Sequence, residues 1–328
     1  MSKLYSKNSK RARAFVCFSV FCSIIMLTAC YVVTQPRKFP IIDVKNIYEV
    51  KFSGELANKS VKEQCSMGFR IPGSRVSKEC ATYISYHLIR YGFEAKYQNF
   101  TAEHDGKVVN FSNVIGAKYG LDNKFTNMII VLGAHYDTRP FADRDKEENK
   151  TKPILGANDG ASGVAVLLEL ARVLSFVELG ISIELVFFDG EDLGKRADEM
   201  FYGSRYYANT LSDQKRENIL AFILVDMVGD DDLQIFKEKN SDKNLISFIW
   251  KVAKMHGCKA FQEEYKYAII DDHIPLKEKG VPVIDIIDFD YPYWHTLEDT
   301  PDKVSAESLE QVGKTLEASI YAINESLD

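Results

Sequence analysis

The sequence predicts a single α/β domain built on a mixed, mostly parallel, twisted β-sheet that is flanked by helices. First, short runs rich in β-branched residues alternate along the chain with amphipathic stretches, which is the order that gives a helix-covered sheet. Second, residues 181–188 (ISIELVFF) and 220–225 (LAFILV) are almost continuously apolar, as expected for strands buried on both faces of a sheet. Third, 46% of the 328 residues are hydrophobic and 27% are charged, which is a globular composition.

Each element follows from its local pattern in chain order. An early helix is expected to end at Gly92, and residues 108–116 form an edge strand paired with residues 94–100. The last helix has apolar residues at helical spacing from Leu309 to Ile323, so one of its faces packs on the core. The full prediction is helix 78–91, strands 94–100, 108–116 and 128–133, helix 163–176, strand 181–188, helix 211–218, strand 220–225, helix 244–256, strand 281–287 and helix 305–324.

Residues 1–29 have the pattern of an export signal. Five basic residues and no acid come first, and residues 14–29 are then uncharged and mostly apolar. This run is shorter than the ~20 residues of a membrane-spanning helix and fits the apolar part of a signal peptide. Its end, Leu27-Thr28-Ala29-Cys30, resembles the signal of bacterial lipoproteins, in which the cysteine is lipidated and becomes the first residue.

We therefore expect a signal peptide over residues 1–29, a lipidated N-terminus and tether over 30–45, and a catalytic domain over 46–328. An uncleaved N-terminal anchor is the alternative. Either arrangement predicts an exported, membrane-anchored protein of the cell envelope, on its periplasmic or outer face.

Charge and cysteine content exclude several classes of protein. The formal net charge is -6, and without residues 1–29 the chain has 36 basic and 47 acidic residues, a net charge of -11. Such a body offers no basic surface to nucleic acid. Cys65, Cys80 and Cys258 are the cysteines of the body, and no CxxC motif indicates a thiolate zinc site. Export permits a disulfide, for which Cys65 and Cys80 are the nearest pair in sequence, and the pairing stays open.

Residues able to bind a metal lie at the ends of the predicted strands. Functional sites of such sheets form at the carboxyl ends of the strands. A single acid there more often caps a helix or a turn, but several converging carboxylates repel one another unless a cation holds them. Oxygen and imidazole ligands without thiolates suit Zn²⁺ in an open catalytic site. The residues are His135, Asp137, Asp159, Glu191, Asp192, Asp226, Asp271 and His295, whereas His87, His104 and His256 are interpreted as structural or solvated.

Seven motifs then occur in a fixed order: GAHYDT (133–138), GANDGASGVAVLLELAR (156–172), FFDGED (187–192), LVDMVG (224–229), DDHIPL (271–276), GVPV (280–283) and WHT (294–296). This order resembles that of the zinc-dependent glutaminyl cyclases of animal and bacterial type, which share the fold of the co-catalytic zinc aminopeptidases. The resemblance covers about residues 65–325, and RIPGS (70–74), FSN (111–113) and YGSR (202–205) extend it.

The resemblance leaves two enzyme classes to be separated. Ligand types do not separate them, because a two-zinc aminopeptidase could use His135, Asp159, Asp192, Asp226 and His295, whereas the cyclases resemble a one-zinc enzyme with Asp159, Asp192 and His295. Two features favour the cyclase: Asp271 stands where aminopeptidases usually carry serine, and Trp294 precedes the terminal histidine. An exported di-zinc aminopeptidase is the alternative, and a non-catalytic exported binding protein is the third class.

The resemblance implies a glutaminyl-peptide cyclotransferase, an acyltransferase that converts the N-terminal Gln of peptides and proteins into pyroglutamate and releases ammonia. One zinc per chain would polarise the γ-amide oxygen. Glu191 would carry the proton from the attacking amine to the leaving nitrogen. Asp271, hydrogen-bonded to Asp226, would hold the leaving amide and orient the substrate, and the two acids would share a proton. Trp294 would pack on the Gln methylenes.

Two supporting residues and two departures complete the prediction. The resemblance implies that His135 lies behind the zinc site and that Asp137 orients it, while a second metal site using His135 stays open. Asp192 stands where animal cyclases have Glu, so the backbone must approach the metal more closely. Residues 193–201 lack the tryptophan of the animal enzymes, which predicts a different substrate mouth. Oligomeric state is not predicted.

Overall fold

The computed structural model describes residues 37–121, 125 and 127–327. The predicted signal peptide and lipidation site lie outside these described residues. The compact body begins at Lys38, earlier than the predicted boundary at residue 46. The reason is that Phe39 is buried and its ring lies 5.5 Å from that of Phe248. In the described part of the chain, no helix is both long and apolar enough to cross a membrane.

The core of the body is a six-stranded sheet with the order β1-β2-β4-β3-β5-β8. Four neighbouring strands, β4, β3, β5 and β8, run parallel, while β2 pairs antiparallel with both β1 and β4. The predicted mixed, mostly parallel sheet is therefore confirmed, but β2 is internal and β1 forms the edge. The strands are β1 Glu94–His104, β2 Lys107–Lys118, β3 Ile129–His135, β4 Ser182–Phe188, β5 Ile219–Asp226 and β8 Val283–Ile287.

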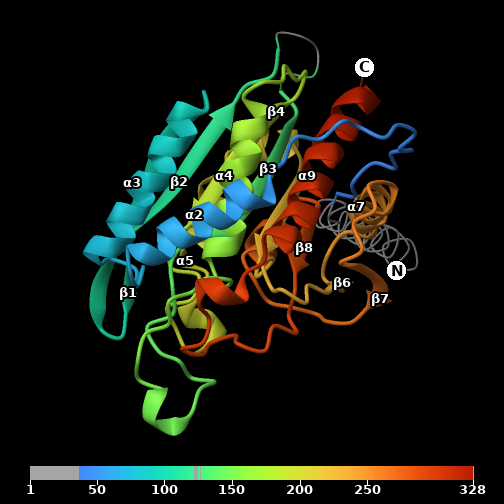
Figure 1. Cartoon of the computed structure of the whole chain (residues 1–328). Helices are drawn as coiled ribbons and strands as arrows, with labels where there is room; N and C mark the ends of the chain where they lie inside the picture. The colour runs from blue at the N-terminus through green and yellow to red at the C-terminus, as the bar shows by residue number, and fades with distance from the viewer. Residues whose placement is uncertain (1–36, 122–124, 126, 328) are drawn as a thin grey trace, which may run out of the picture. The chain divides into compact units, whose positions relative to one another are not determined.

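Helices cover both faces of this sheet. Figure 1 shows α2, α3, α4 and α9 over one face, while α5 and α8 contribute to the smaller apolar cluster on the other. The central helix α4 is buried along almost its whole length, because α2 and α9 pack on the side that faces away from the sheet. The helices are α2 Gly54–Ser66, α3 Arg75–Arg90, α4 Ala161–Leu174, α5 Tyr202–Thr210, α6 Asp213–Asn218, α7 Lys243–Met255, α8 His273–Glu278 and α9 Ala306–Leu327, and a two-stranded sheet joins β6 Ile235–Lys237 to β7 Phe261–Tyr265.

A close contact between α4 and β5 sets the distance between two predicted site residues. A Cβ atom built on Gly163 would lie 2.1 Å from the carbonyl oxygen of Val225, so only glycine allows the first turn of α4 to press against the end of β5. Asp159 comes just before the N-cap of α4, Gly160, and Asp226 is the last residue of β5. The two carboxylates are thereby brought to the same end of the sheet.

The three cysteines of the body are free and buried. Cys65 and Cys80, the nearest pair in sequence, are thus not joined by a disulfide. Burial raises the pKa of the Cys80 thiol to about 12. A thiol held neutral in this way packs as a small apolar side chain.

Candidate active site

The carboxyl ends of the parallel strands open into a cleft of about 440 Å³. It is lined by the residues predicted to bind metal, to catalyse and to hold substrate: Asp159, Asp192, His295, Glu191, Asp226, Asp271 and Trp294. His135 and Asp137 are buried within contact distance of these acids. The structure therefore brings all nine predicted site residues to one place, although they come from segments up to 160 residues apart (His135 to His295).

Asp159, Asp192 and His295 form a group that fits a metal ion. Their ligand atoms lie within 4.8 Å of one another, and Nε2 of His295 lies 3.6 Å from Oδ2 of Asp159 and 3.5 Å from Oδ1 of Asp192. The Oδ2 atoms of both aspartates are buried without a hydrogen-bond partner. Burial, with a contribution from Asp159, raises the pKa of Asp192 to about 7. Two orphaned carboxylate oxygens beside an imidazole nitrogen are the donor set that Zn²⁺ takes in a catalytic site.

A second group shares Asp159 with the first. Nε2 of His135 lies 3.1 Å from both Oδ1 of Asp159 and Oδ1 of Asp226, and the three residues could also hold a metal ion. Burial opposes protonation of His135, but the carboxylates around it, Asp226 foremost, raise its pKa well above the usual value. An imidazolium here offsets the charge of both carboxylates, whereas a metal ion would require a neutral ring.

Glu191 lines the cleft next to the group formed by Asp159, Asp192 and His295. Gly190, with φ of 76°, turns the chain at the end of β4. The carboxylate of Asp137 then accepts hydrogen bonds from the backbone N–H groups of Glu191 and Asp192, at 3.0 and 3.1 Å. Burial, followed by repulsion from Asp192, raises the pKa of Glu191 well above its usual value. This is the environment that a carboxylate acting as a proton carrier near neutral pH requires.

Asp137 contacts two parts of the site. It was predicted to orient His135, and its Oδ1 lies 3.7 Å from Nδ1 of that ring, an ion-pair distance. The same carboxylate fixes the direction of the backbone N–H groups of Glu191 and Asp192. Asp137 therefore contacts the histidine and the two adjacent acids together.

Asp226 and Asp271 both face the cleft, as predicted for a cooperating pair. Among the described residues, however, no hydrogen bond joins the two carboxyl groups. Burial, together with the charge of Asp226, raises the pKa of Asp271 well above its usual value. Behind Asp271 lie Asp285 and His273, both fully buried and without hydrogen bonds to their side-chain oxygens and ring nitrogens. Asp285 was not predicted, because its only signal in the sequence is a single acid in the otherwise apolar run 281–287.

One wall of the cleft is apolar and aromatic. The Trp294 ring lies 4.7 Å from that of Phe289, and Tyr267, Ile269 and Ile287 belong to the same cluster. Sequence reasoning found only the tryptophan, because the other residues come from a loop and a strand end that carry no motif. This wall is suited to the methylene groups of a substrate side chain.

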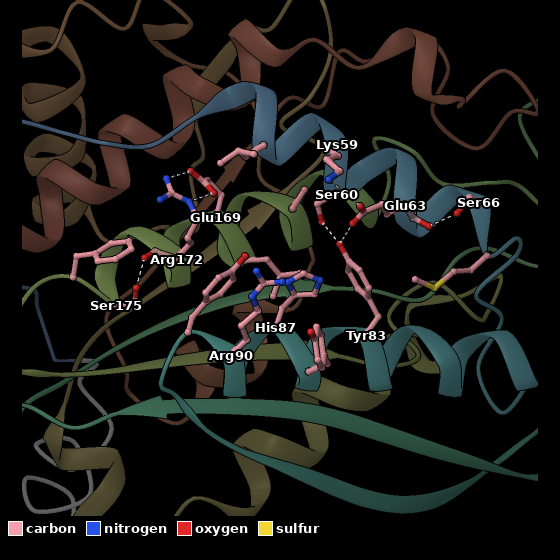
Figure 2. Close-up of a pocket in the computed structure, with 17 residues that line it drawn as sticks. Lys59, Ser60, Glu63, Ser66, Tyr83, His87, Arg90, Glu169, Arg172 and Ser175 are labelled. Atoms are coloured by element: carbon pink, nitrogen blue, oxygen red, sulfur yellow. Dashed lines mark hydrogen bonds and ion pairs between the residues drawn. The ribbon is translucent and has the colours of Figure 1, made fainter.

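A larger cleft, of about 950 Å³, lies between α2, α3 and α4 (Figure 2). There the Tyr83 hydroxyl hydrogen bonds to Ser60 and Glu63, at 3.0 and 2.8 Å, and the ring of His87 lies 4.5 Å from that of Tyr83. None of the metal-binding groups found among the described residues lies in this cleft. Although this cleft is the larger of the two, it is therefore not the candidate active site. His87 packs against an aromatic ring, which agrees with the structural role predicted for it.

A third group able to hold a metal ion consists of Asp271, His273 and Asp285, so the described residues contain three such groups. Together with the parallel sheet and the convergence of acids and histidines at its carboxyl edge, these groups define a metalloenzyme of the zinc exopeptidase type. The chain belongs to peptidase family M28, whose model matches residues 113–320. The glutaminyl-peptide cyclotransferase of the snake Boiga irregularis is 25% identical over 293 residues, which cover 76% of each protein.

Solved structures agree with this assignment. A glutaminyl cyclase from Bacteroides thetaiotaomicron, bound to N-acetylhistamine, is 33% identical and has a TM-score of 0.77, with 85% of this chain and 99% of that chain covered. A Zn-dependent exopeptidase from Parabacteroides distasonis is 31% identical with a TM-score of 0.77, over 83% of this chain and 99% of that chain. The predicted family and fold are thereby confirmed.

Proposed function

We propose that this protein is a zinc-dependent glutaminyl-peptide cyclotransferase, which converts an N-terminal Gln into pyroglutamate and releases ammonia. The observation that carries the proposal is the position of Asp271: it adds a third acid to Glu191 and Asp226 in the cleft, at the place where the aminopeptidase pattern has serine. The similarity to glutaminyl cyclases along almost the whole of their chains supports the same function.

The chemistry is an intramolecular acyl transfer. The α-amine of the substrate attacks the carbon of its own γ-amide, a C–N bond forms, and the original amide nitrogen leaves as ammonia. Asp159, Asp192 and His295 would hold the zinc, which would supply a Lewis acid for the γ-amide oxygen. Glu191 accepts the proton that the amine loses and donates it to the leaving nitrogen.

The remaining cleft residues bind and orient the substrate. Trp294 and Phe289 contact the Gln methylenes and exclude water from the reacting groups. Asp226 and Asp271 accept hydrogen bonds from the amine and the amide N–H groups. Burial and the charge of Asp226 favour the protonated form of Asp271, so this pair of acids carries one proton while Asp226 stays ionised.

We propose one zinc per chain, bound by the group that contains His295. The alternative, a di-zinc aminopeptidase, is favoured by one observation: His135, Asp159 and Asp226 form a second group that could hold a metal ion. Cyclisation needs no attacking water, so it gives a second metal no task. Elemental analysis of the purified protein separates the two, because the cyclase predicts about one zinc and the aminopeptidase about two.

The direct test uses two substrates side by side. The chain without residues 1–29 is incubated with Gln-β-naphthylamide and, separately, with leucine β-naphthylamide. The proposal predicts pyroglutamyl-β-naphthylamide and free ammonia from the first, and no naphthylamine from the second. Release of naphthylamine from the leucine substrate without any cyclisation would assign the protein to the aminopeptidases, and no reaction with either would favour a binding protein.

We also propose that the protein is exported and anchored to a membrane of the cell envelope through a lipid on Cys30. The support is the sequence pattern of residues 1–30, which has a basic start, an uncharged apolar run and the ending Leu-Thr-Ala-Cys. Peptides or proteins with an N-terminal Gln in that compartment would be the substrates.

A further inference from the structure

One proposed metal ligand has an unusual backbone conformation. His295 has φ of 57°, in the left-handed region that residues other than glycine rarely adopt. Such a conformation costs free energy and persists only where surrounding contacts hold it. The contacts that hold His295 therefore show which residues build the metal site.

These contacts come from one short loop, residues 139–145, which we name the clamp loop. Asp143 Oδ1 lies 3.0 Å from Nδ1 of His295, and the backbone N–H of Arg144 donates to the carbonyl of His295 at 3.3 Å. Asp145 accepts a hydrogen bond from the N–H of Leu297 at 2.8 Å. The clamp loop thus fixes both the ring and the backbone of this ligand.

Arg139 extends the same clamp to a second ligand. Its Nε and Nη2 atoms donate to the two oxygens of Asp143, each at 3.0 Å, and its Nη1 donates to Oδ1 of Asp192. Arg139 is buried with 3% of its surface exposed, and Asp192 with 1%. Because Arg139 occupies Oδ1, the partnerless oxygen of Asp192 is Oδ2.

We propose that Arg139 and Asp143 are positioning residues of the zinc site. Asp143 accepts a hydrogen bond from Nδ1 of His295, which selects the tautomer whose Nε2 is free to bind the metal and turns that nitrogen toward Asp159 and Asp192. Arg139 binds Oδ1 of Asp192 and thereby fixes the orientation of this carboxylate, whose Oδ2 has no other partner. This arrangement also explains how an aspartate can act as a metal ligand at a position where animal cyclases have a glutamate. The guanidinium group of one arginine holds the shorter side chain in a single orientation.

The proposal rests on the zinc site of the proposed function but not on the reaction, so zinc affinity tests it directly. The variants are Asp143→Ala and Arg139→Gln, measured by competition with a chromophoric zinc chelator. Loss of such a supporting contact typically weakens metal affinity 10- to 100-fold, and we expect this range for both variants. Asp143→Asn keeps an oxygen that accepts from Nδ1, so it should recover part of the lost affinity.

A second measurement separates positioning from a general loss of structure. Cobalt replaces zinc, and the visible absorption of the loaded protein reports the ligand geometry. We expect a changed spectrum in Asp143→Ala and a partial return toward that of the wild type in Asp143→Asn. The matched control is Asp213→Asn, which removes a surface ion pair with Arg216 at 3.1 Å and should alter neither measurement.

The outcomes are distinct. Zinc dissociation constants within twofold of the wild type in both variants, with an unchanged cobalt spectrum, overturn the proposal. If Arg139→Gln does not fold, Arg139→Lys keeps the charge but cannot reach both Asp143 and Asp192, and a wild-type affinity in that variant also overturns it. If the wild type binds zinc but does not cyclise Gln substrates, the proposed function fails while the affinity series still decides the role of the clamp loop.

Discussion

Replacing two adjacent acids should have opposite consequences for metal and for catalysis. Glu191 and Asp192 follow each other after β4, and both backbone N–H groups are held by Asp137. Only Asp192 belongs to a metal-binding group. Glu191→Gln keeps the size of the side chain and removes its ability to accept a proton. We therefore expect Glu191→Gln to lose turnover while retaining zinc, and Asp192→Asn to lose zinc.

The size of the catalytic effect follows from the role of the acid. A positioned general base contributes about 10²- to 10⁴-fold, which corresponds to roughly 3–5 kcal/mol of activation free energy at 1.36 kcal/mol per tenfold change. Glu191→Gln should lower kcat by this factor with KM nearly unchanged, because the burial of the site and the aromatic wall stay intact. Asp192→Asn should weaken zinc binding by more than the ~100-fold that the loss of a supporting contact can cause.

The assay combines steady-state cyclisation of Gln-β-naphthylamide with zinc analysis of the same preparations. Glu191→Asp is the graded control, since it keeps the carboxylate but withdraws it by one methylene group, and it should give an intermediate kcat. Full activity in Glu191→Gln would refute the role of this acid as the proton carrier. Loss of zinc in Glu191→Gln would refute the division of labour between the two residues and place Glu191 among the ligands.

Three further predictions test separate parts of the structure. Chelation should abolish cyclisation, and titration back with Zn²⁺ should restore full activity at about one equivalent; a requirement for two would favour the aminopeptidase. Burial lowers the pKa of His273 to about 3 in the folded protein, whereas the unfolded chain has the ordinary histidine pKa of ~6.5. Below pH 6.5 only the unfolded chain binds this proton, so the free energy of unfolding falls as the pH falls from 6.5 toward 3. In urea titrations between pH 6.5 and 4, His273→Gln should therefore show a weaker dependence of this free energy on pH than the wild type. Cys30→Ser should move the full-length protein from the membrane fraction to the soluble fraction, and its retention in the membrane would indicate an uncleaved anchor.

The parallel part of the fold was predictable because its signal is local. β3, β4, β5 and β8 are short apolar runs, and each lies within two residues of its predicted bounds. The error at β2 arose because a half-polar strand reads like an edge strand, whereas β2 is covered by β1, whose burial alternates along its length.

Helix α2 was missed for a different reason. Its sequence GELANKSVKEQCS is mostly polar, and the few apolar residues do not outline a strong face. The helix is specified by its cap, where the Ser53 side chain accepts from the N–H of Leu56, and by packing against α4 and α9. Tertiary contacts of this kind override weak local preference.

Some residues of the site can be predicted from local sequence patterns, whereas others depend on contacts between distant segments of the chain. Strand ends are defined by the apolar runs before them, so the sequence locates Glu191, Asp192 and Asp226 at one edge of the sheet, while Asp159 is located by the start of the apolar helix α4. No apolar run fixes the position of the clamp loop in the same way. Arg139 and Asp143 lie in a charged stretch whose sequence is typical of a solvated turn. Their partners, Asp192 and His295, are 53 and 152 residues further along the chain. Only the fold shows that Arg139 is buried there. The positions of the proposed zinc ligands are thus set by the fold around the sheet, whereas the orientation of two of them depends on a loop contact that no local pattern encodes.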